Sequence, residues 1–385
     1  MMLILKNGLF LSAEGKFEKG DIAICDDTIS SIGSLPGDGE ASEIFDVEGC
    51  KVVPGLIDIH CHGAVGHDVM TSSPPQLKEI AEHLAKNGTT SFFPTTITSR
   101  MEDLLNVLRN VKEASKMAGC GSSIEGVHIE GPYINAAHKG CHDPSLIKQP
   151  TLEEYESFRE IMGDLKIHMT VAPEMPGNME FIKYAVSKGS TVGIGHSDGN
   201  CSDVKKGLEA GATIFTHLFN GMRGIHHREP GVAGTALASD AFVELICDGI
   251  HVHPEIIKMV YRVKGKEKIV LVTDAMQATG FGDGEFSFGG FRVFVKDGIA
   301  RKEDGTLAGS TLTMFKAIKN MMKFTGIPLE DAVSMASLNP AKVVGLSHIT
   351  GSIQPGKRAD LVVIDGSMEI KMVFCRGKLV RADLM

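Results

Sequence analysis

Short apolar runs and helix-like stretches alternate through the middle of the chain, and this alternation restricts the fold more than any other feature. We predict strands at residues 52–59, 90–96, 124–130, 167–172, 191–196, 213–218, 242–247 and 269–274. Helices are predicted at 75–87, 101–118, 152–162, 179–188, 201–210, 313–325 and 329–336. Eight strand–helix units of this length match an α/β fold of the (β/α)8 TIM-type barrel class. A doubly wound open sheet would alternate in the same way. However, no Gly-x-Gly-x-x-Gly follows the first strand, which weakens the nucleotide-binding version of that fold.

The two ends of the chain have a different pattern, in which short β-type runs are separated by glycine and aspartate. These runs lie at 3–5, 21–25, 28–32 and 44–47, and again at 359–365, 371–376 and 378–381. We therefore predict a small β-sandwich domain formed by both chain termini, residues 1–52 and 350–385. The barrel domain would take residues 53–349 and carry an inserted β-hairpin at about residues 281–307.

Composition excludes several classes of protein. With 43% hydrophobic and 23% charged residues, the 385-residue chain has the composition of a folded globular protein. A net charge of -9 argues against a nucleic-acid partner, although a few local cations can still bind a small anionic substrate. No run approaches the ~20 apolar residues of a membrane span, and the apolar stretch at the N-terminus is too short for a signal peptide. Eight scattered cysteines without Cys-x-x-Cys are typical of reduced thiols, so we expect a cytoplasmic protein.

Polar side chains follow the predicted strands where each strand ends. The first strand ends in His60-Cys61-His62, and side-chain alternation makes the two histidines point the same way. The other strand ends carry Glu130, preceded by His128 on the same face, and then His196, His217 and Asp274. Taken singly, each has a plain structural interpretation, as a satisfied core histidine or a helix cap. Together, so many buried polar groups would each need a separate partner, whereas one divalent metal site satisfies them at once.

Imidazole and carboxylate ligands without clustered thiolates suit zinc, iron(II), manganese or cobalt. His60 and His62 would supply one metal position, and His196 and His217 another, with Glu130 bridging the two or serving the second alone. Asp274 would hydrogen-bond a water at the metal, whose pKa a bound ion lowers towards ~7, and would move its proton. The residues therefore predict metal-assisted hydrolysis with one or two divalent ions per subunit.

The strand-end residues belong to a longer series of motifs in a fixed order. The series comprises Pro-Gly-Leu-Ile-Asp-Ile-His-Cys-His (54–62), His-Ile-Glu-Gly-Pro-Tyr (128–133), Lys-Gly-Cys-His-Asp-Pro (139–144), Gly-His-Ser (195–197), Thr-His-Leu-Phe-Asn-Gly-Met (216–222), Arg-Glu-Pro-Gly (228–231), Asp-Gly-Ile-His (248–251), Val-Thr-Asp-Ala (272–275) and Leu-Ala-Gly-Ser (307–310). Through them the chain resembles the amidohydrolase superfamily over essentially its whole length, and within it the N-acetylglucosamine-6-phosphate deacetylases. The resemblance implies metal-dependent removal of acetate from N-acetylglucosamine 6-phosphate in amino-sugar catabolism, with zinc the first expectation for the metal.

The resemblance also implies roles for individual residues. Glu130, His196 and His217 would hold the core metal, and Asp274 would act first as general base and then as general acid. His142 would contact the reacting amide or the sugar. The remaining substrate and phosphate contacts implied are Asn220, Gly221, Arg228, His251 and Ala308. The Arg228 guanidinium suits bidentate binding of phosphate, and His227 beside it could add charge or be a solvated surface histidine. Loops of this kind can reach a neighbouring subunit, which implies a homodimer with phosphate-binding residues contributed across the interface.

Two details bear on the number of metals. Some members of the family lack one histidine of the first-strand pair and bind a single metal, whereas this chain keeps both His60 and His62. Other superfamily members carboxylate a lysine of strand four to bridge two metals, but Lys166 lies at the wrong end of that strand. Glu130 fits as its replacement, which disfavours a dihydroorotase-like or hydantoinase-like enzyme.

Two other functions stay open at this point. The first is a related amidohydrolase that acts on another N-acyl amino sugar or N-acyl amino acid. The second is a barrel kept as a scaffold, with metal serving stability. A scaffold predicts a missing ligand or a missing general base, and this sequence lacks neither.

Overall fold

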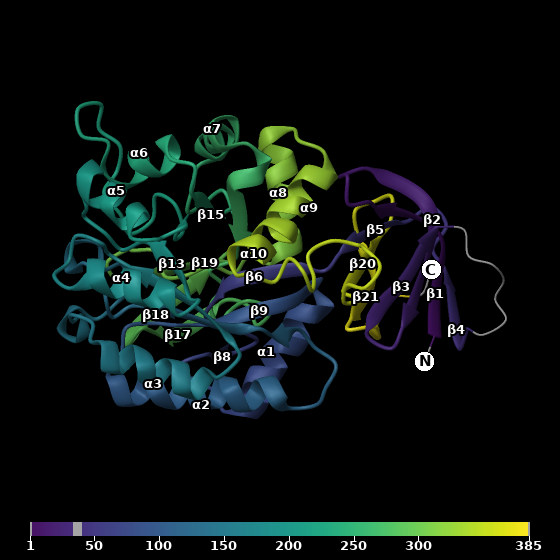
Figure 1. Ribbon diagram of the computed structural model, residues 1–385, viewed down its shortest axis with the longest axis horizontal. Helices are drawn as coiled ribbons and strands as arrows, with labels where there is room; N and C mark the ends of the chain where they lie inside the picture. Colours follow the sequence, from purple (N-terminus) through teal and green to yellow (C-terminus); the bar gives the residue numbers. More distant parts are fainter. Residues whose placement is uncertain (1, 34–40, 384–385) are drawn as a thin grey trace.

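The computed structural model describes residues 2–33 and 41–383, which form a barrel with a smaller sheet packed beside it (Figure 1). The barrel consists of eight parallel strands: β6 (Leu56–Cys61), β9 (Thr89–Thr96), β11 (Gly126–Glu130), β12 (Lys166–Val171), β13 (Thr191–Ile194), β14 (Ile214–Phe215), β15 (Phe242–Ile246) and β16 (Ile269–Val272). Each strand pairs with the next, and short β10 (Ser123–Ile124) extends β9. A parallel bridge between Cys61 and Ala275 brings the first strand next to the last. The predicted TIM-type α/β fold is therefore confirmed.

Helices surround this barrel (Figure 1). They are α1 (Pro74–Lys86), α2 (Met101–Lys116), α3 (Leu152–Met162), α4 (Asn178–Ser187), α5 (Cys201–Glu209), α6 (Gly231–Ala238), α7 (Pro254–Lys264), α8 (Met314–Thr325), α9 (Leu329–Ala336) and α10 (Leu338–Val343). The seven predicted helices match observed ones to within about two residues at each end, and capping boxes mark the starts of α1 at Ser73 and of α3 at Thr151. The sequence prediction missed α6, α7 and α10. In α6, apolar residues surround the helix without a 3.6-residue period. Among the described residues, no helix combines the length and apolarity needed to cross a bilayer.

Both ends of the chain build the smaller sheet. Its strands are β1 (Met2–Leu11), β2 (Phe17–Cys25), β3 (Thr28–Gly33), β4 (Glu43–Asp46), β5 (Lys51–Pro54), β20 (Leu361–Ile364), β21 (Ile370–Cys375) and β22 (Lys378–Ala382). Successive side chains of a strand point to opposite faces, so a strand that lies between the two cores has two apolar faces. In β20, Leu361 and Val363 pack into the core of the small sheet, whereas Val362 and Ile364 pack into the core of the barrel. The terminal sheet is thus fixed to the barrel by every second side chain of this strand, which packs into the barrel core.

The division of the chain at residues 52/53 and 349/350 stays a prediction. Residues 1, 34–40 and 384–385 of the predicted terminal domain lie outside the described residues. Strand β5, at Lys51–Pro54, crosses the first of the two boundaries and belongs to the terminal sheet.

Two sequence predictions need correction. The run 52–59 is not one strand, because β5 and β6 belong to different sheets and are separated at Gly55. A side chain at Gly55 would overlap the Thr90 hydroxyl, so the chain passes from one sheet to the other where only glycine fits. The inserted hairpin is instead a three-stranded antiparallel sheet of β17 (Gly284–Phe288), β18 (Phe291–Lys296) and β19 (Ile299–Lys302). A two-stranded ribbon, β7 (Gly63–Ala64) with β8 (His67–Asp68), follows the first barrel strand.

Candidate metal centre

The predicted strand-end residues meet at the carboxyl-terminal rim of the barrel, and three of them have an unusual backbone. Strands β13, β14 and β16 each end two residues before His196, His217 and Asp274, so the predicted strands were too long there. These three residues have φ values of 45°, 30° and 49°, in the left-handed region that side chains other than glycine rarely adopt. Such strain persists where the surrounding structure enforces it, and it gathers at functional sites. The backbone conformation of Asp274 is held from both sides, because its N–H donates to His60 O at 2.9 Å and its carbonyl accepts from Ser310 N at 2.7 Å.

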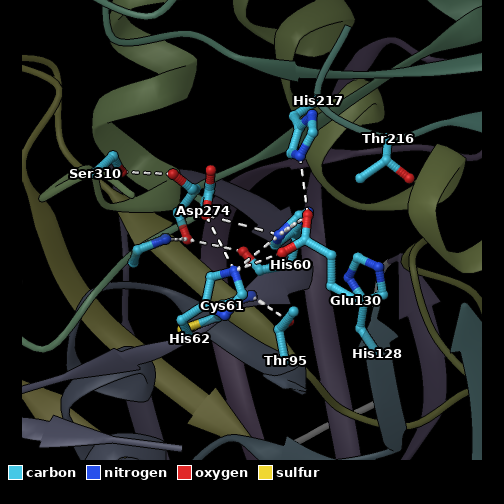
Figure 2. A network of polar contacts seen from close by, with 12 residues as sticks. His60, Cys61, His62, Thr95, His128, Glu130, Thr216, His217, Asp274 and Ser310 are labelled. Atoms are coloured by element: carbon cyan, nitrogen blue, oxygen red, sulfur yellow. Dashed lines mark hydrogen bonds and ion pairs between the residues drawn. The ribbon is translucent and has the colours of Figure 1, made fainter. Parts of the chain in front are cut away.

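Glu130 lies at the centre of the cluster, with imidazoles around its carboxylate (Figure 2). The Nε2 atoms that face it belong to His217 at 2.9 Å, His196 at 3.2 Å, His62 at 3.3 Å, His142 at 3.5 Å and His60 at 3.6 Å. The Asp274 carboxylate adds a second negative charge, with Oδ1 at 3.3 Å from His62 Nε2. All of these side chains are buried or nearly so. The sequence therefore gathers two carboxylates and five imidazoles around one buried point.

The hydrogen bonds on the far side of two rings show which nitrogens are available for a metal. His196 Nδ1 lies 2.7 Å from the His138 carbonyl oxygen, and His60 Nδ1 lies 3.1 Å from Glu244 Oε2. Both partners only accept, so each Nδ1 carries a proton, and in its neutral, metal-ligating form each ring presents the Nε2 lone pair to the centre. There the two lone pairs meet carboxylate oxygens and the Nε2 atoms of His217 and His62, at 3.0 and 3.1 Å. Acceptors that converge in this way fit a divalent cation.

His142 has the opposite tautomer. Its Nδ1 accepts from the backbone N–H of Thr98 at 3.2 Å and lies 2.7 Å from the Thr98 hydroxyl. Burial lowers the pKa of His142 to about 4, and the neighbouring His196 ring adds to this effect, so the His142 ring is neutral and its proton lies on Nε2. Glu130, His142 and His196 form one group with the spacing of metal ligands, and His60, His62 and Asp274 form another. Because His142 turns an N–H into the centre, we assign it as a hydrogen-bond donor and His217 as the partner of Glu130 and His196.

The electrostatics of the centre favour positive charge. Burial alone would raise the pKa of Glu130, but the surrounding rings, His60 first and then His142, His196 and His217, hold it well below its ordinary value. Burial would lower the pKa of His62, but its hydrogen bonds to Asp274 and Glu130 raise it to about 9. Two ionised carboxylates in a water-poor site therefore stabilise any cation placed between them.

A cavity of about 300 Å³ opens onto this centre. The predicted residues that line it are His62, Glu130, His142, His196, His217, Asn220, Gly221, His251 and Asp274. His60 lies beneath them and is fully buried. At the edge of the cavity, His251 Nδ1 contacts Asp248 Oδ2 at 2.6 Å; burial would lower the pKa of His251, but this carboxylate raises it.

Two predicted substrate contacts lie elsewhere in this chain. Arg228 is exposed and its Nη1 contacts His227 Nε2 at 2.9 Å, and neither residue lines the cavity. Ala308 is fully buried, while its neighbours Leu307 and Gly309 reach the cavity wall. The sequence pattern predicted the loops correctly as neighbours of the site, but not which residue of each loop faces it.

The sequence analysis also missed a buried polar layer beneath the centre, formed by His128, His168, Thr170, Thr216 and Glu244. Of these, only His128 was noticed, as a residue on the face of Glu130. Glu244 had a detectable signal, because an acid in the middle of the apolar run Phe-Val-Glu-Leu-Ile is unusual in a buried barrel strand.

Comparisons with known proteins agree with this geometry. The model of the amidohydrolase family matches residues 51–380. The chain is 34% identical to an N-acetylgalactosamine-6-phosphate deacetylase of Escherichia coli O157:H7, over 98% of this chain and 99% of that protein. It superposes with a TM-score of 0.94 and 31% identity on the N-acetylglucosamine-6-phosphate deacetylase of Pasteurella multocida, with both chains fully covered. A mutant N-acetyl-D-glucosamine-6-phosphate deacetylase of Mycobacterium smegmatis, in complex with N-acetyl-D-glucosamine-6-phosphate, superposes with a TM-score of 0.90 and 30% identity over 99% of each chain.

The family match covers the barrel and strands β5 and β20–β22 of the terminal sheet, and the relatives cover nearly the whole chain. The chain therefore belongs to the amidohydrolase family.

Proposed function

We propose that this protein is a metal-dependent deacetylase that hydrolyses N-acetylglucosamine 6-phosphate to glucosamine 6-phosphate and acetate, in amino-sugar catabolism. The observation that carries the proposal is the convergence of Glu130, Asp274 and the His60, His62, His196 and His217 rings on one buried point. Whole-length similarity to deacetylases of N-acetyl amino-sugar phosphates supports the choice of substrate class.

The residues that would hold the metal fall into two sets. Glu130, His196 and His217 would hold the core ion, and His60 and His62, beside Asp274, offer a second position. When bound, a divalent ion supplies positive charge that polarises the amide carbonyl and lowers the pKa of water. Zinc is our first choice, and iron(II), manganese and cobalt suit the same ligands.

Asp274 would carry the proton. Its carboxylate is ionised, lies at the cavity wall and reaches the centre at 3.3 Å from His62 Nε2. It would accept a proton from the attacking water as that oxygen bonds to the carbonyl carbon. It would then return the proton to the sugar nitrogen as the carbon–nitrogen bond breaks and acetate forms.

His142 would stabilise the charge that develops on the carbonyl oxygen. Its neutral ring holds an N–H in the cavity, fixed by the contacts of Thr98 to its other nitrogen. A donor held in place before the reaction needs no rearrangement when negative charge appears. We infer that His142 donates to the carbonyl oxygen of the substrate.

The phosphate would be bound by groups at the cavity edge and by a second subunit. Asn220, Gly221 and His251 line the cavity, whereas the Arg228 guanidinium of the same chain projects elsewhere on an exposed loop. We propose a homodimer in which Arg228, and His227 beside it, bind the phosphate in the cavity of the partner subunit.

Mixing two variants would test the delivery of Arg228 across an interface. Arg228→Ala should raise KM at least tenfold and leave kcat nearly unchanged, because a phosphate contact remote from the reacting bond contributes uniform binding. When Arg228→Ala subunits are mixed with inactive Asp274→Asn subunits, half of the sites regain both groups and the low KM should return. Arg262→Ala, which removes an exposed arginine of α7, is the control. Failure to regain the low KM in a verified mixed dimer would contradict the arrangement.

A second candidate substrate is N-acetylgalactosamine 6-phosphate, which the name of the Escherichia coli relative favours. The decisive experiment measures acetate release from both 6-phosphates and from unphosphorylated N-acetylglucosamine. We expect the highest kcat/KM with N-acetylglucosamine 6-phosphate. A higher value with the galactose epimer would make that the substrate, and equal rates with and without phosphate would remove the phosphate assignment.

We also propose that the protein works in the cytoplasm. Cys25 and Cys120 are exposed thiols without a disulfide, a state that a reducing compartment maintains.

A further inference from the structure

A fully buried carboxylate, Glu244, lies in the interior of the barrel on strand β15. Barrel interiors are normally filled by branched apolar side chains, and burying a carboxylate is costly unless it is paired. Glu244 therefore needs a reason to be there, and its contacts supply one.

Glu244 touches both sets of candidate metal ligands. Its Oε2 accepts from His60 Nδ1 at 3.1 Å and from the backbone N–H of His217 at 3.1 Å. Its own carbonyl accepts from Leu218 N at 2.9 Å, so the backbone on both sides of the His217 carbonyl is tied to one residue. His60 belongs to the first barrel strand and His217 follows the sixth, and Glu244 joins the two ligands directly.

Each contact fixes something that a metal ligand requires. Because Oε2 can only accept, it keeps the His60 proton on Nδ1 and leaves the Nε2 lone pair directed to the centre. The bond to His217 N restrains a residue whose φ of 30° is unfavourable for a histidine. The Glu244 carboxylate thus fixes the tautomer of His60 and the backbone conformation of His217.

The surroundings of Glu244 are shaped to accommodate it. Its Oε1 lies 3.2 Å from His168 Nε2, and the His168 ring packs on His128 with centroids 4.3 Å apart. On strand β13, which pairs with the strand of His168, a Cβ at Gly193 would lie 2.7 Å from Thr216 Oγ1 and 3.4 Å from His168 Cε1. The missing side chain leaves the space that this polar layer fills.

We propose that Glu244 is a positioning residue that couples the two halves of the metal centre, through the ring of His60 and the backbone of His217. The proposal rests on the metal-dependent function proposed above. It assigns Glu244 no contact with substrate or metal. A purely structural role, as the partner of His168 inside the barrel, is the competing explanation.

Metal binding distinguishes the two explanations. Glu244→Gln keeps the shape and, with its oxygen towards His217 N–H, keeps neutral hydrogen bonds but loses the charge. Glu244→Ala loses both. Each protein, freed of metal, would be titrated with Co²⁺ while the visible absorption of the bound ion is recorded, and Kd would be measured by competition with a chelator. Asp360→Asn is the matched control, because Asp360, immediately before strand β20, is a buried carboxylate without contact to the candidate ligands.

We expect Glu244→Gln to raise the Kd for Co²⁺ about 10-fold and Glu244→Ala to raise it about 100-fold, the range for residues that orient metal ligands. The absorption spectrum should change in both variants, while Asp360→Asn should keep the wild-type Kd and spectrum. Wild-type Kd and spectrum in Glu244→Gln would overturn the proposal, even where Glu244→Ala fails to fold. Equal weakening in Asp360→Asn would also overturn it, because the effect would then be one of general stability. A wild-type protein that binds no Co²⁺ would instead contradict the proposed function itself.

Discussion

The chain buries two clusters of charged side chains, and they are built differently. The Arg358 cluster, which consists of Ser91, Glu125, Arg358 and Asp360, joins the terminal sheet to the barrel. Arg358 Nε donates to Asp360 Oδ2 at 2.6 Å, Nη2 donates to Ser91 Oγ at 2.6 Å, and Nη1 pairs with Glu125. Each of these donors meets an acceptor, so the cluster is complete without any further group.

The rim cluster around Glu130 is not complete in this way. When His60 and His196 are neutral, their Nε2 lone pairs face carboxylate oxygens, so acceptor meets acceptor. Among the described residues, His62 Nδ1 and His217 Nδ1 are buried without a hydrogen-bond partner. Burial of charge alone therefore does not identify a functional site. The mismatch of donors and acceptors does, because only a metal ion or added protons can satisfy it.

Removal of metal is the most severe test of this comparison. Treatment with a chelator should abolish turnover, and Zn²⁺ or Co²⁺ should restore it, because the rim cluster depends on the ion. Metal at 100 times Kd should also stabilise the fold by about 2.7 kcal/mol, visible as a higher Tm. The measurements are acetate release and thermal unfolding, before and after treatment. Full activity at a metal content near zero would contradict the difference drawn between the clusters.

Asp274→Asn should have the next largest effect. Loss of the proton carrier should lower kcat by about 10²–10⁴-fold. Metal content should persist, since Glu130, His196 and His217 remain. Steady-state kinetics and metal analysis of the same sample check this prediction, and near-normal turnover would remove Asp274 from the mechanism.

Arg358→Met tests the other cluster. It leaves Glu125 and Asp360 without their cation, and breaking a buried pair in this way should cost about 3–5 kcal/mol in the free energy of unfolding. The Kd for metal, measured well below the lowered Tm, should stay at the wild-type value. Replacing Glu125 and Asp360 together with Arg358 by apolar residues of similar size should recover much of the loss. A changed metal affinity in Arg358→Met would show that the two clusters are coupled.

The pH dependence of the metal-free protein should differ from that of the metal-loaded protein. The pKa of His62 is raised to about 9 by Asp274 and Glu130, so its protonated form stabilises the fold. That contribution is complete below the ordinary pKa of about 6.5 and is lost as pH rises through 9, a change of about 3 kcal/mol. Metal-free protein should therefore lose stability between pH 6.5 and 9, and metal-loaded protein should lose less. Denaturant unfolding at several pH values measures both, and identical curves would contradict the assignment.

The sequence predicted the barrel well because its strands are short apolar runs, whereas its helices repeat apolar residues with a 3.6-residue period. It failed where a different constraint acted. The continuous apolar run at 52–59 hides the passage between two sheets at Gly55, since residues on both sides are buried. Helix α6 is apolar on all sides and therefore shows no period.

The candidate ligands were found from their positions at strand ends, but their supports were not. Glu244 and His168 lie inside strands, at positions that a pattern-based interpretation assigns to the core. Tautomers also leave no trace in the sequence: His142 and His196 are equivalent as letters. The difference lies in their neighbours. The Thr98 N–H beside His142 makes that ring a hydrogen-bond donor to the centre, and the His138 carbonyl beside His196 makes that ring a metal ligand.

The smallest effect should come from His60→Gln, which divides the rim cluster into its two halves. If Glu130, His196 and His217 hold the core ion, the variant should keep one metal per subunit and lose about tenfold in activity, at the low end of the range for ligand supports. His196→Gln is the matched variant, since it makes the same exchange in the other half and should lose both metal and turnover. Metal content per subunit and kcat would be measured together for the two variants. Equal losses would mean that the halves act as one unit and would contradict the assignment of the core ion to Glu130, His196 and His217. Unequal losses would locate the indispensable ion beside Glu130 and make the His60–His62 pair an addition to it.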